Sequence, residues 1–496
     1  MFFHLSQSVG SGKTQAILHY LRDNLDAPYL YVTPTIVLCE EIYQRLQIVL
    51  VDHHDLLREG GVQLIVSDPN LDAVSVRASI AVREIEQNGR GVVIVTEKAF
   101  QYLLSDMDDE LKGSFKVFID EGLPPIRSVE FSPGDHDQFL KYFSQDARGF
   151  ITAAKGCKGL IEDVVLRPGR LHENNLDDLD NPKFRTICEM VHSGNYDVYL
   201  KTERKIQVVG LLSPMPMMAF ASVTLVVAIF EQTLLPIFWL QKYGVEFAPF
   251  DLGVELYDTH EAKGPSISIH HVLHERDNAS KDVLQSNFET GERRETDARK
   301  QVIYAAAQQI NRHFPNGAFC WAANNDFKNP GNVLEGDRMP AQSAGLDRYR
   351  RQDTVVSLVC INPQPWVKTA LLEIFELDDD TLYELWRLSP TYQTVGRCSL
   401  RDRNSEREVQ LVVISRRCAQ QLSELFAGSR IVGQITNLPS FRDLRRRNKR
   451  EQQNKRVFTP ADNTAYSKYK RRCLRKNEEP LAKEFWYEQK RKPWLA

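Results

Sequence analysis

Short apolar runs alternate with amphipathic stretches over the first 120 residues of the chain. The apolar runs are rich in Val, Ile, Leu, Phe and Tyr, which is typical of strands buried on both faces of a parallel sheet. The stretches between them repeat apolar residues every three to four positions, as helices do. This alternation predicts an α/β domain with a doubly wound parallel sheet flanked by helices. The expected strands are 2–5, 29–35, 62–66, 91–96 and 115–119, and the expected helices are 14–21, 36–49, 78–87 and 97–104.

The alternation weakens between Pro124 and about Leu212, where residues 176–180 form an acidic stretch typical of a loop. We interpret residues 124–212 as an insertion and assign no chemistry to it. The pattern returns at 223–228, with a helix expected at 231–243 and a strand at 245–247. The first domain is therefore expected to cover residues 1–251.

A second αβ pattern follows the break at Gly264-Pro265. It predicts a second α/β domain over residues 252–440, followed by a separate tail over residues 441–496. The expected strands are 266–272, 318–323, 354–359 and 409–414, and the expected helices are 297–313 and 418–425.

A candidate phosphate-binding loop lies between the first expected strand and the first expected helix. It fits the pattern G-x-x-x-x-G-K-[ST] except that Gln7 replaces the first glycine. Backbone N–H groups of such a loop surround a triphosphate, Lys13 reaches the β- and γ-phosphates, and the Thr14 hydroxyl is a ligand for Mg²⁺. The residues expected to bind the nucleotide are Ser8, Val9, Gly10, Ser11, Gly12, Lys13 and Thr14.

An acidic pair, Asp120 and Glu121, follows the strand expected at 115–119. Carboxylates at the carboxyl end of a parallel strand lie at the ligand-binding edge of the sheet. We expect Asp120 to hold Mg²⁺ through water and Glu121 to orient or deprotonate the attacking water. The pair therefore predicts the second half of an ATPase site.

The composition is that of an ordinary soluble protein, with 42% apolar and 26% charged residues in 496. The net charge of −3 is unevenly spread: residues 441–496 carry a net +11 and the rest −14. The eight cysteines never occur as C-x-x-C, and the longest mostly apolar run, 217–230, is too short to span a bilayer. We therefore expect no membrane partner and a cytoplasmic protein, in a bacterium or a phage-infected host.

The order of these motifs resembles that of the superfamily-two helicases and translocases, motor ATPases with two RecA-like domains. The matching segments are Gly12-Lys13-Thr14, Thr33-Pro34-Thr35, Val95-Thr96-Glu97, Asp120-Glu121-Gly122-Leu123, 343–347 and 393–397. The resemblance implies ATP and Mg²⁺ as cofactors and nucleic acid as partner. It also implies that Thr33, Pro34, Thr35 and Thr96 contact the nucleic-acid backbone, that Gly345 and Asp347 lie at the nucleotide, and that Gln393, Arg397 and Arg401 complete the site from the second domain.

The sequence departs from the family pattern in several places. Leu400 takes the place of the last arginine of Q-x-x-G-R-x-x-R, so Arg397 and Arg401 both remain candidates for the arginine finger. The family's third motif is represented by 227–229 or by 152–154, of which the latter is expected to lack a strand. The segment before the loop is too short for an adenine-reading Q motif, so we do not expect a strict DEAD-box or DEAH-box protein.

The tail combines Lys and Arg clusters with interleaved aromatic residues. Basic groups neutralise phosphates and aromatic rings stack on exposed bases, so we expect the tail to bind single strands, with contacts from Arg446, Lys470 and Arg471. The alternative is a solvated tail that docks on the acidic body.

These observations predict an ATP-dependent helicase or translocase, with DNA favoured over RNA because strict RNA-helicase signatures are absent. The compact organisation suggests a phage or mobile-element source. Two alternatives remain: a viral DNA-packaging motor, and a non-hydrolysing nucleic-acid-binding protein with a decayed loop, for which Gln7 is the best evidence. The oligomeric state is left open.

Overall fold

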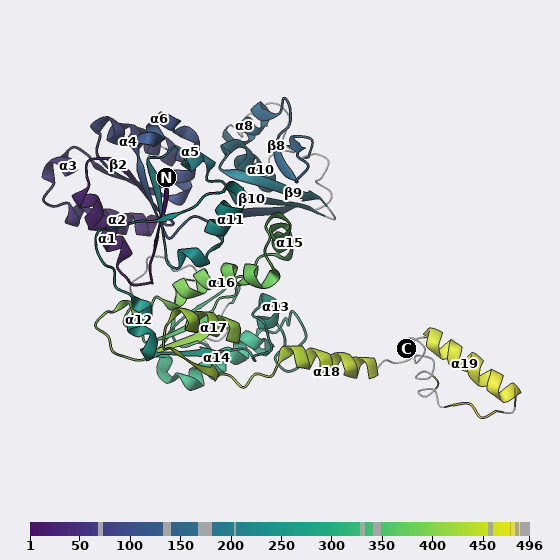
Figure 1. Ribbon diagram of the computed structural model, residues 1–496. Helices are drawn as coiled ribbons and strands as arrows, with labels where there is room; N and C mark the ends of the chain where they lie inside the picture. Colours follow the sequence, from purple (N-terminus) through teal and green to yellow (C-terminus); the bar gives the residue numbers. More distant parts are fainter. Residues whose placement is uncertain are drawn as a thin grey trace.

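The computed structural model describes most of the chain as two α/β domains, an insertion and a helical tail (Figure 1). The residues described are 1–67, 73–131, 140–166, 181–202, 205–327, 333–340, 349–454, 460–476, 478–481 and 486.

The first domain contains a seven-stranded, fully parallel sheet in the order β12-β1-β11-β5-β2-β4-β3. Its strands are β1 (Phe2–Ser6), β2 (Pro28–Thr33), β3 (Val62–Ile65), β4 (Gly91–Thr96), β5 (Lys116–Asp120), β11 (Ser222–Val227) and β12 (Ala248–Pro249). The predicted doubly wound parallel sheet is confirmed. Only β11 separates β1 from β5, so the segments that follow these two strands meet at one edge of the sheet.

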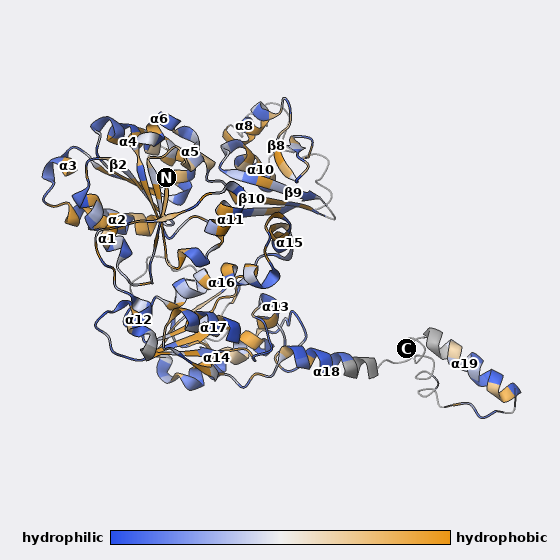
Figure 2. Ribbon diagram, viewed as in Figure 1, coloured by the Kyte–Doolittle hydropathy of each residue, from blue (hydrophilic) through white to orange (hydrophobic). Residues whose placement is uncertain are grey.

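Helices cover both faces of this sheet. Apolar side chains of α1 (Lys13–Asp23), α2 (Ile36–Val49) and α3 (His54–Arg58) form one buried cluster with the strands. Those of α4 (Val74–Asn88), α5 (Glu97–Asp106) and α11 (Leu234–Tyr243) form another, and the short α6 (Asp109–Ser114) precedes β5. Figure 2 shows the corresponding pattern, with orange strands inside and blue outer faces on the helices.

Four predicted boundaries in the two domains are wrong by three residues or more. The helix expected at 78–87 begins at Val74. The helix expected at 231–243 begins at Leu234, because Thr233 is extended (φ −112°, ψ 164°) after a short 3₁₀ turn. The helix expected at 297–313 begins at Val302, after a 3₁₀ turn and an extended Gln301. The strand expected at 245–247 lies instead at β12, where Ala248 pairs with Phe3 of β1.

The insertion is an ordered antiparallel sheet in the order β6-β10-β9-β8-β7, although the sequence pattern there is weak. Its strands are β6 (Ile126–Phe131), β7 (Phe143–Gln145), β8 (Phe150–Ala153), β9 (Tyr196–Thr202) and β10 (Ile206–Leu212), with helices α8 (Lys158–Leu166) and α10 (Pro182–Ser193). The expectation that 152–154 lacks a strand is wrong, because Thr152 and Ala153 belong to β8. That strand nevertheless lies in the insertion and not beside the phosphate loop.

The second domain contains a six-stranded parallel sheet in the order β15-β14-β16-β17-β13-β18. Its strands are β13 (Ile267–His271), β14 (Cys320–Ala323), β15 (Asp337–Arg338), β16 (Thr354–Leu358), β17 (Val409–Val413) and β18 (Arg430–Gln434). Helix α14 (Val302–His313) packs on one face, while α16 (Asp379–Val395) and α17 (Arg416–Leu425) pack on the other. The link between the domains contains α12 (Thr259–Lys263), and the short α13 (Lys281–Leu284) follows β13.

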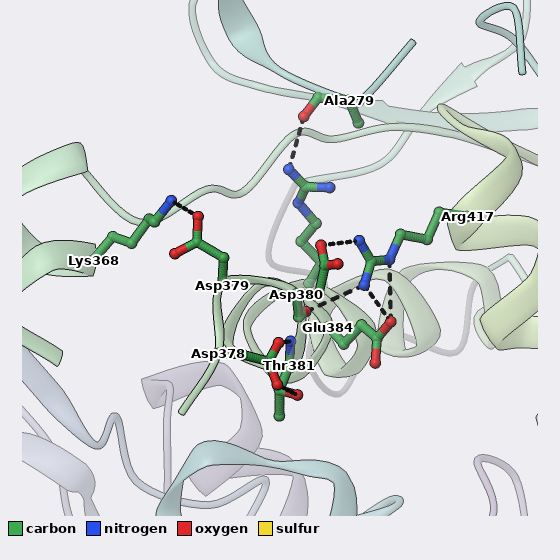
Figure 3. A network of polar contacts seen from close by, with 9 residues as sticks. Ala279, Lys368, Asp378, Asp379, Asp380, Thr381, Glu384 and Arg417 are labelled. Carbon is green, nitrogen blue, oxygen red and sulfur yellow. Dashed lines mark hydrogen bonds and ion pairs between the residues drawn. The ribbon is translucent and has the colours of Figure 1, made fainter. Parts of the chain in front are cut away.

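Helix α16 lies between the two domains and is fixed at its N-terminal end by ion pairs (Figure 3). Arg417 of α17 binds Asp380 at 2.7 Å and Glu384 at 2.5 Å. Lys368 of α15 (Pro365–Ile374) pairs with Asp379. These contacts orient the helix whose other end carries Gln393.

Helix α15 ties the second domain to the first domain and its insertion. The ring of Phe375 stacks on that of Phe238 in α11, with centroids 4.0 Å apart and planes 5° apart. Glu373 accepts hydrogen bonds from Tyr199 and Lys201 of β9. The two α/β domains therefore share a packed connection outside the cavity described below.

Most of the described part of the basic tail is helical, in α18 (Phe441–Asn454) and α19 (Pro460–Arg475). The N–H groups of Phe441 and Arg442 donate to the Asp277 carboxylate, at 2.8 and 3.1 Å. Phe441 and Leu444 are buried in the second domain, so the start of α18 belongs to that core. The helix then projects from the body, with a predominantly hydrophilic surface (Figures 1 and 2).

No helix among the described residues is long and apolar enough to cross a membrane. The apolar run at 217–230 forms β11 and its flanking turns, in the centre of the first sheet. All eight cysteines are free thiols.

Candidate functional site

The predicted phosphate loop joins β1 to α1, and its glycines have the backbone geometry that only glycine adopts readily. Gly10 and Gly12 have φ of 74° and 90°. The Lys13 ammonium donates to the carbonyl oxygens of Gln7 at 2.8 Å and Ser8 at 2.9 Å. Gln7 is not among the described residues with positive φ and contributes its backbone carbonyl, so position 7 does not require a glycine here.

The acidic pair lies opposite this loop, at the end of β5. The Thr14 hydroxyl donates to Asp120 Oδ2 at 3.1 Å, and the Tyr31 hydroxyl donates to the same oxygen at 2.9 Å. Glu121 has a positive φ of 67°, and its N–H donates to the carbonyl of Val226 in β11. This backbone turn presents both carboxylates at the carboxyl edge of the sheet.

Burial and charge shift the protonation of the two central groups. Burial lowers the pKa of Lys13 to about 8, against the opposing attraction of Glu121 and Asp120. Burial, followed by the neighbouring charge of Glu121, raises the pKa of Asp120 to about 6, while the hydrogen bond from Tyr31 lowers it. A carboxylate in this environment is stabilised by an added cation, which is what a Mg²⁺ site requires.

Residues of both domains line one cavity. From the first domain, the predicted residues in its wall are Val9, Gly10, Gly12, Lys13, Thr14, Asp120 and Glu121. From the second domain, the predicted residues in its wall are Gln393, Arg397 and Arg401. Ser8 and Ser11 belong to the same loop, but they are buried and do not line the cavity.

Both candidate arginines reach the cavity. Arg397 is fully buried, and its Nη2 lies 3.6 Å from Glu121 Oε1. Arg401 donates from Nε to the Gly396 carbonyl at 2.9 Å. A Cβ added at Gly10 would lie 3.0 Å from the Arg401 Cα, so the loop and this arginine are in close contact.

A 3₁₀ turn places Arg401, and not residue 400, at the cavity. The turn covers 399–401, and it directs Leu400 into the hydrophobic core of the second domain. Arg401, the next residue, therefore lines the cavity.

The third-motif candidate at 227–229 also lies at this site, because β11 is adjacent to β1. Val226 and Ala228 line the cavity, and Ile229 adopts a positive φ of 52° just after the strand. The segment matches the family motif weakly in sequence but lies next to the phosphate loop in space.

The threonines expected to contact nucleic acid lie at the carboxyl ends of β2 and β4. The Thr33 side chain is buried, and its hydroxyl donates to the carbonyl of Thr35. Thr35 and Thr96 cap helices α2 and α5, each accepting a backbone N–H through its hydroxyl. Thr35 is exposed, and Pro34 and Thr96 are partly buried, so these three residues form the accessible part of the edge.

The remaining predicted residues lie away from the cavity or outside the described residues. Gly345 and Asp347 belong to the segment that the structure does not describe. Arg446 is exposed on α18, and Lys470 and Arg471 are exposed on α19, on the helices that project from the body (Figure 1).

The tail aromatic residues contact one another. The rings of Tyr466 and Tyr469 lie 5.5 and 5.4 Å from that of Trp486, centroid to centroid. Stacking on bases would therefore use the outer faces of a cluster and not isolated rings.

Several cavity residues were missed by sequence reasoning. Tyr31 holds Asp120, and Gln15, Glu41 and Arg45 line the cavity from α1 and α2. Arg45 binds Glu41 at 3.1 Å and the Gln15 side chain at 2.8 Å. A tyrosine within a buried strand is an ordinary core residue by pattern, and polar residues on a helix resemble a solvated face, so nothing in the sequence marked them.

No protein-family model matches the chain, and no curated protein matches it. Among solved structures, it is similar to a hypothetical ATP-dependent RNA helicase from Sulfolobus tokodaii, at 12% identity and a TM-score of 0.24, covering 85% of this chain and 90% of that one. It is similar to S. cerevisiae Dbp5 bound to RNA and ADP BeF3, at 10% identity and a TM-score of 0.33, covering 91% and 89%. A third is the DEAD-box helicase Mss116 bound to ssRNA and UDP-BeF, at 13% identity and a TM-score of 0.36, covering 96% and 79%. At these values the function of those proteins does not extend to this chain.

Proposed function

We propose that the chain is an ATP-dependent nucleic-acid motor of the helicase or translocase type. The observation that carries the proposal is the shared cavity. A phosphate loop and an acidic pair from one parallel sheet face Gln393, Arg397 and Arg401 from another domain. A DNA-packaging motor needs the first two features but not the arginine-bearing segment, so this arrangement favours the helicase type.

Each cavity group has a role in phosphoryl transfer to water. Lys13 neutralises the β- and γ-phosphates, and the N–H groups of the loop surround them. Glu121 accepts a proton from the attacking water or orients it. Arg397 and Arg401 stabilise the charge that develops on the transferred phosphoryl group.

The oxygen atoms of Thr14 and Asp120 fit a Mg²⁺ site. They lie 3.1 Å apart, and hard oxygen ligands of this kind suit Mg²⁺, which also retains several waters. Thr14 and Asp120 would hold the ion, which would supply positive charge against the negative charge of the phosphates.

Nucleic acid is proposed to contact the edge formed by Pro34, Thr35 and Thr96 and the basic helices of the tail. Opening and closing of the cavity would move contacts on the two domains relative to each other. We propose DNA as the strand, with the tail contributing Arg446, Lys470 and Arg471 as phosphate contacts.

The test is the rate of ATP hydrolysis by the full chain, measured alone, with single-stranded DNA and with single-stranded RNA. We expect a Mg²⁺-dependent rate that a single strand stimulates and that Lys13→Ala abolishes. A wild-type chain that binds nucleic acid and never hydrolyses ATP would instead support the non-hydrolysing alternative. Greater stimulation by RNA than by DNA would still support a motor, but one whose substrate is RNA.

A further inference from the structure

Hydrogen bonds from the segment that links the two domains hold the phosphate loop in place. Thr259, at the start of α12, donates from its hydroxyl to the Val9 carbonyl at 2.8 Å. The Thr259 N–H donates to the Ser8 hydroxyl at 2.9 Å. Thr259 is fully buried, so these bonds are shielded from water. Hydrogen bonds in such an environment are costly to lose.

The second domain holds the same loop at a second carbonyl. Arg403, which follows the motif-like segment ending at Arg401, donates from Nη2 to the Ser11 carbonyl at 2.8 Å. Its guanidinium lies over the ring of Tyr257, 5.1 Å from the centroid, which fixes its plane. A Cβ added at Gly12 would lie 2.7 Å from Arg403 Nη2, so a larger residue there would displace this guanidinium.

Because the peptide bond is planar, these two contacts fix the orientation of two peptide groups of the loop. In a trans peptide, the C=O of one residue and the N–H of the next point in opposite directions, and no described peptide bond is cis. A Val9 carbonyl directed to Thr259 turns the Gly10 N–H the other way. A Ser11 carbonyl directed to Arg403 does the same for the Gly12 N–H. Both glycines line the cavity.

A third contact holds the loop from helix α16. The Val9 N–H donates to the Tyr392 hydroxyl at 2.9 Å, and that hydroxyl also bonds His260 Nε2 at 2.5 Å. The Val9 side chain is buried in the second domain's hydrophobic cluster. A Cβ added at Gly396 would lie 2.5 Å from Val9 Cγ2, so α16 and the loop are closely packed.

We propose that Thr259 and Arg403 are positioning residues for nucleotide binding, which orient the Gly10 and Gly12 N–H groups toward the phosphates of a nucleoside triphosphate. The inference rests on the proposed function and deepens it. The affinity for the phosphates then depends on the link and the second domain as well as on the first. Neither residue touches the nucleotide in this arrangement, since neither lines the cavity.

The experiment measures the Kd for ADP and for a non-hydrolysable ATP analogue by calorimetric titration of the full chain. It uses wild type, Arg403→Ala and Thr259→Val, together with steady-state ATP hydrolysis and melting temperature. We expect each variant to raise both Kd values and the KM about tenfold, as for the loss of one buried or charge-assisted hydrogen bond. The kcat at saturating ATP should stay within about twofold, because the catalytic groups remain in place.

Two further variants separate positioning from general structural damage. Arg403→Lys keeps a donor for the Ser11 carbonyl and should recover part of the lost affinity. Arg407→Ala changes another arginine of the segment that contains Arg403. Arg407 pairs with Asp353 at 2.8 Å, and its substitution should leave the Kd unchanged.

The outcomes distinguish this inference from the proposed function. No nucleotide binding by wild type would overturn the proposed function. Binding by wild type with unchanged Kd in both Arg403→Ala and Thr259→Val would overturn the positioning role alone. A fall in kcat at constant Kd would also overturn it, since the residues would then act in turnover and not in binding.

Discussion

The two walls of the cavity contribute different kinds of group. The first domain supplies backbone N–H groups, Lys13 and the acidic pair, all within a few residues of strands in one sheet. The second domain supplies Gln393, Arg397 and Arg401 from the end of a helix and the turns that follow it. Under the proposed function, the first wall would bind phosphates and activate water, whereas the second would add positive charge where negative charge develops during transfer.

The largest effect is expected from a substitution in the first wall, in the phosphate loop. Lys13→Ala removes the cation proposed to neutralise the β- and γ-phosphates, and we expect ATP hydrolysis to be lost. The measurement is phosphate release at saturating ATP with single-stranded DNA. Most of the wild-type rate in this variant would show that the loop is not the phosphate site.

The next effect separates the walls. Arg397→Ala should lower nucleic-acid-stimulated turnover by roughly 10³-fold, in the range known for arginine fingers. The affinity for ATP in the absence of nucleic acid should change far less. Arg401→Ala is the comparison, and we expect its turnover defect to be the smaller.

These two variants also rank the arginines. Arg397 is fully buried and lies 3.6 Å from Glu121, so a melting temperature must accompany its rate. If Arg401→Ala has no turnover while Arg397→Ala turns over at the wild-type rate, the arginine finger is Arg401. Normal rates in both would contradict the contribution of the second wall.

Glu121→Gln tests chemistry against binding within the first wall. We expect turnover to fall by about 10²-fold or more, because the neutral amide cannot accept the proton of the attacking water. Binding of ATP should persist, since the phosphates are held by the loop. Equilibrium titration with ATP checks this, and an absence of binding would indicate a structural role for Glu121.

Tyr31→Phe should have a smaller effect, because it removes one of the two described hydrogen bonds to Asp120 and keeps the ring. We expect turnover to fall about tenfold at limiting Mg²⁺, with partial recovery at high Mg²⁺. The measurement is the Mg²⁺ dependence of ATP hydrolysis. An unchanged Mg²⁺ dependence would argue against a positioning role for Tyr31.

The smallest effect concerns the tail. Arg446→Ala, Lys470→Ala and Arg471→Ala together should reduce the log–log salt slope of single-strand binding by about 0.7 for each phosphate that the tail no longer neutralises. Truncation after Leu438 is a poorer test, because Phe441 and Leu444 are buried in the second domain. A triple variant with an unchanged slope would favour docking of the tail on the body.

The first wall was accessible from the sequence because each of its two motifs is a short contiguous stretch of the chain. Gly12, Lys13 and Thr14 lie in one turn that requires glycine geometry, and Asp120 and Glu121 follow one apolar strand. The alternation of continuous apolar runs with helical 3.6-residue periods also predicted both α/β domains. In the insertion, the sequence did not show a sheet where β6 and β8 lie, because these strands alternate irregularly between buried, half-buried and exposed positions.

The sequence by itself therefore determined the local elements, the order of the motifs and the acidic and basic division of the chain. Only the tertiary structure decided which residues meet. It brought Tyr31 to Asp120, Thr259 to Val9 and Arg403 to Ser11, across separations of 89, 250 and 392 positions. It also directed Leu400 inward and Arg401 to the cavity. The physical reason is that periodicity and turn chemistry act between near neighbours, whereas strand order and domain contacts are set by burial of whole faces.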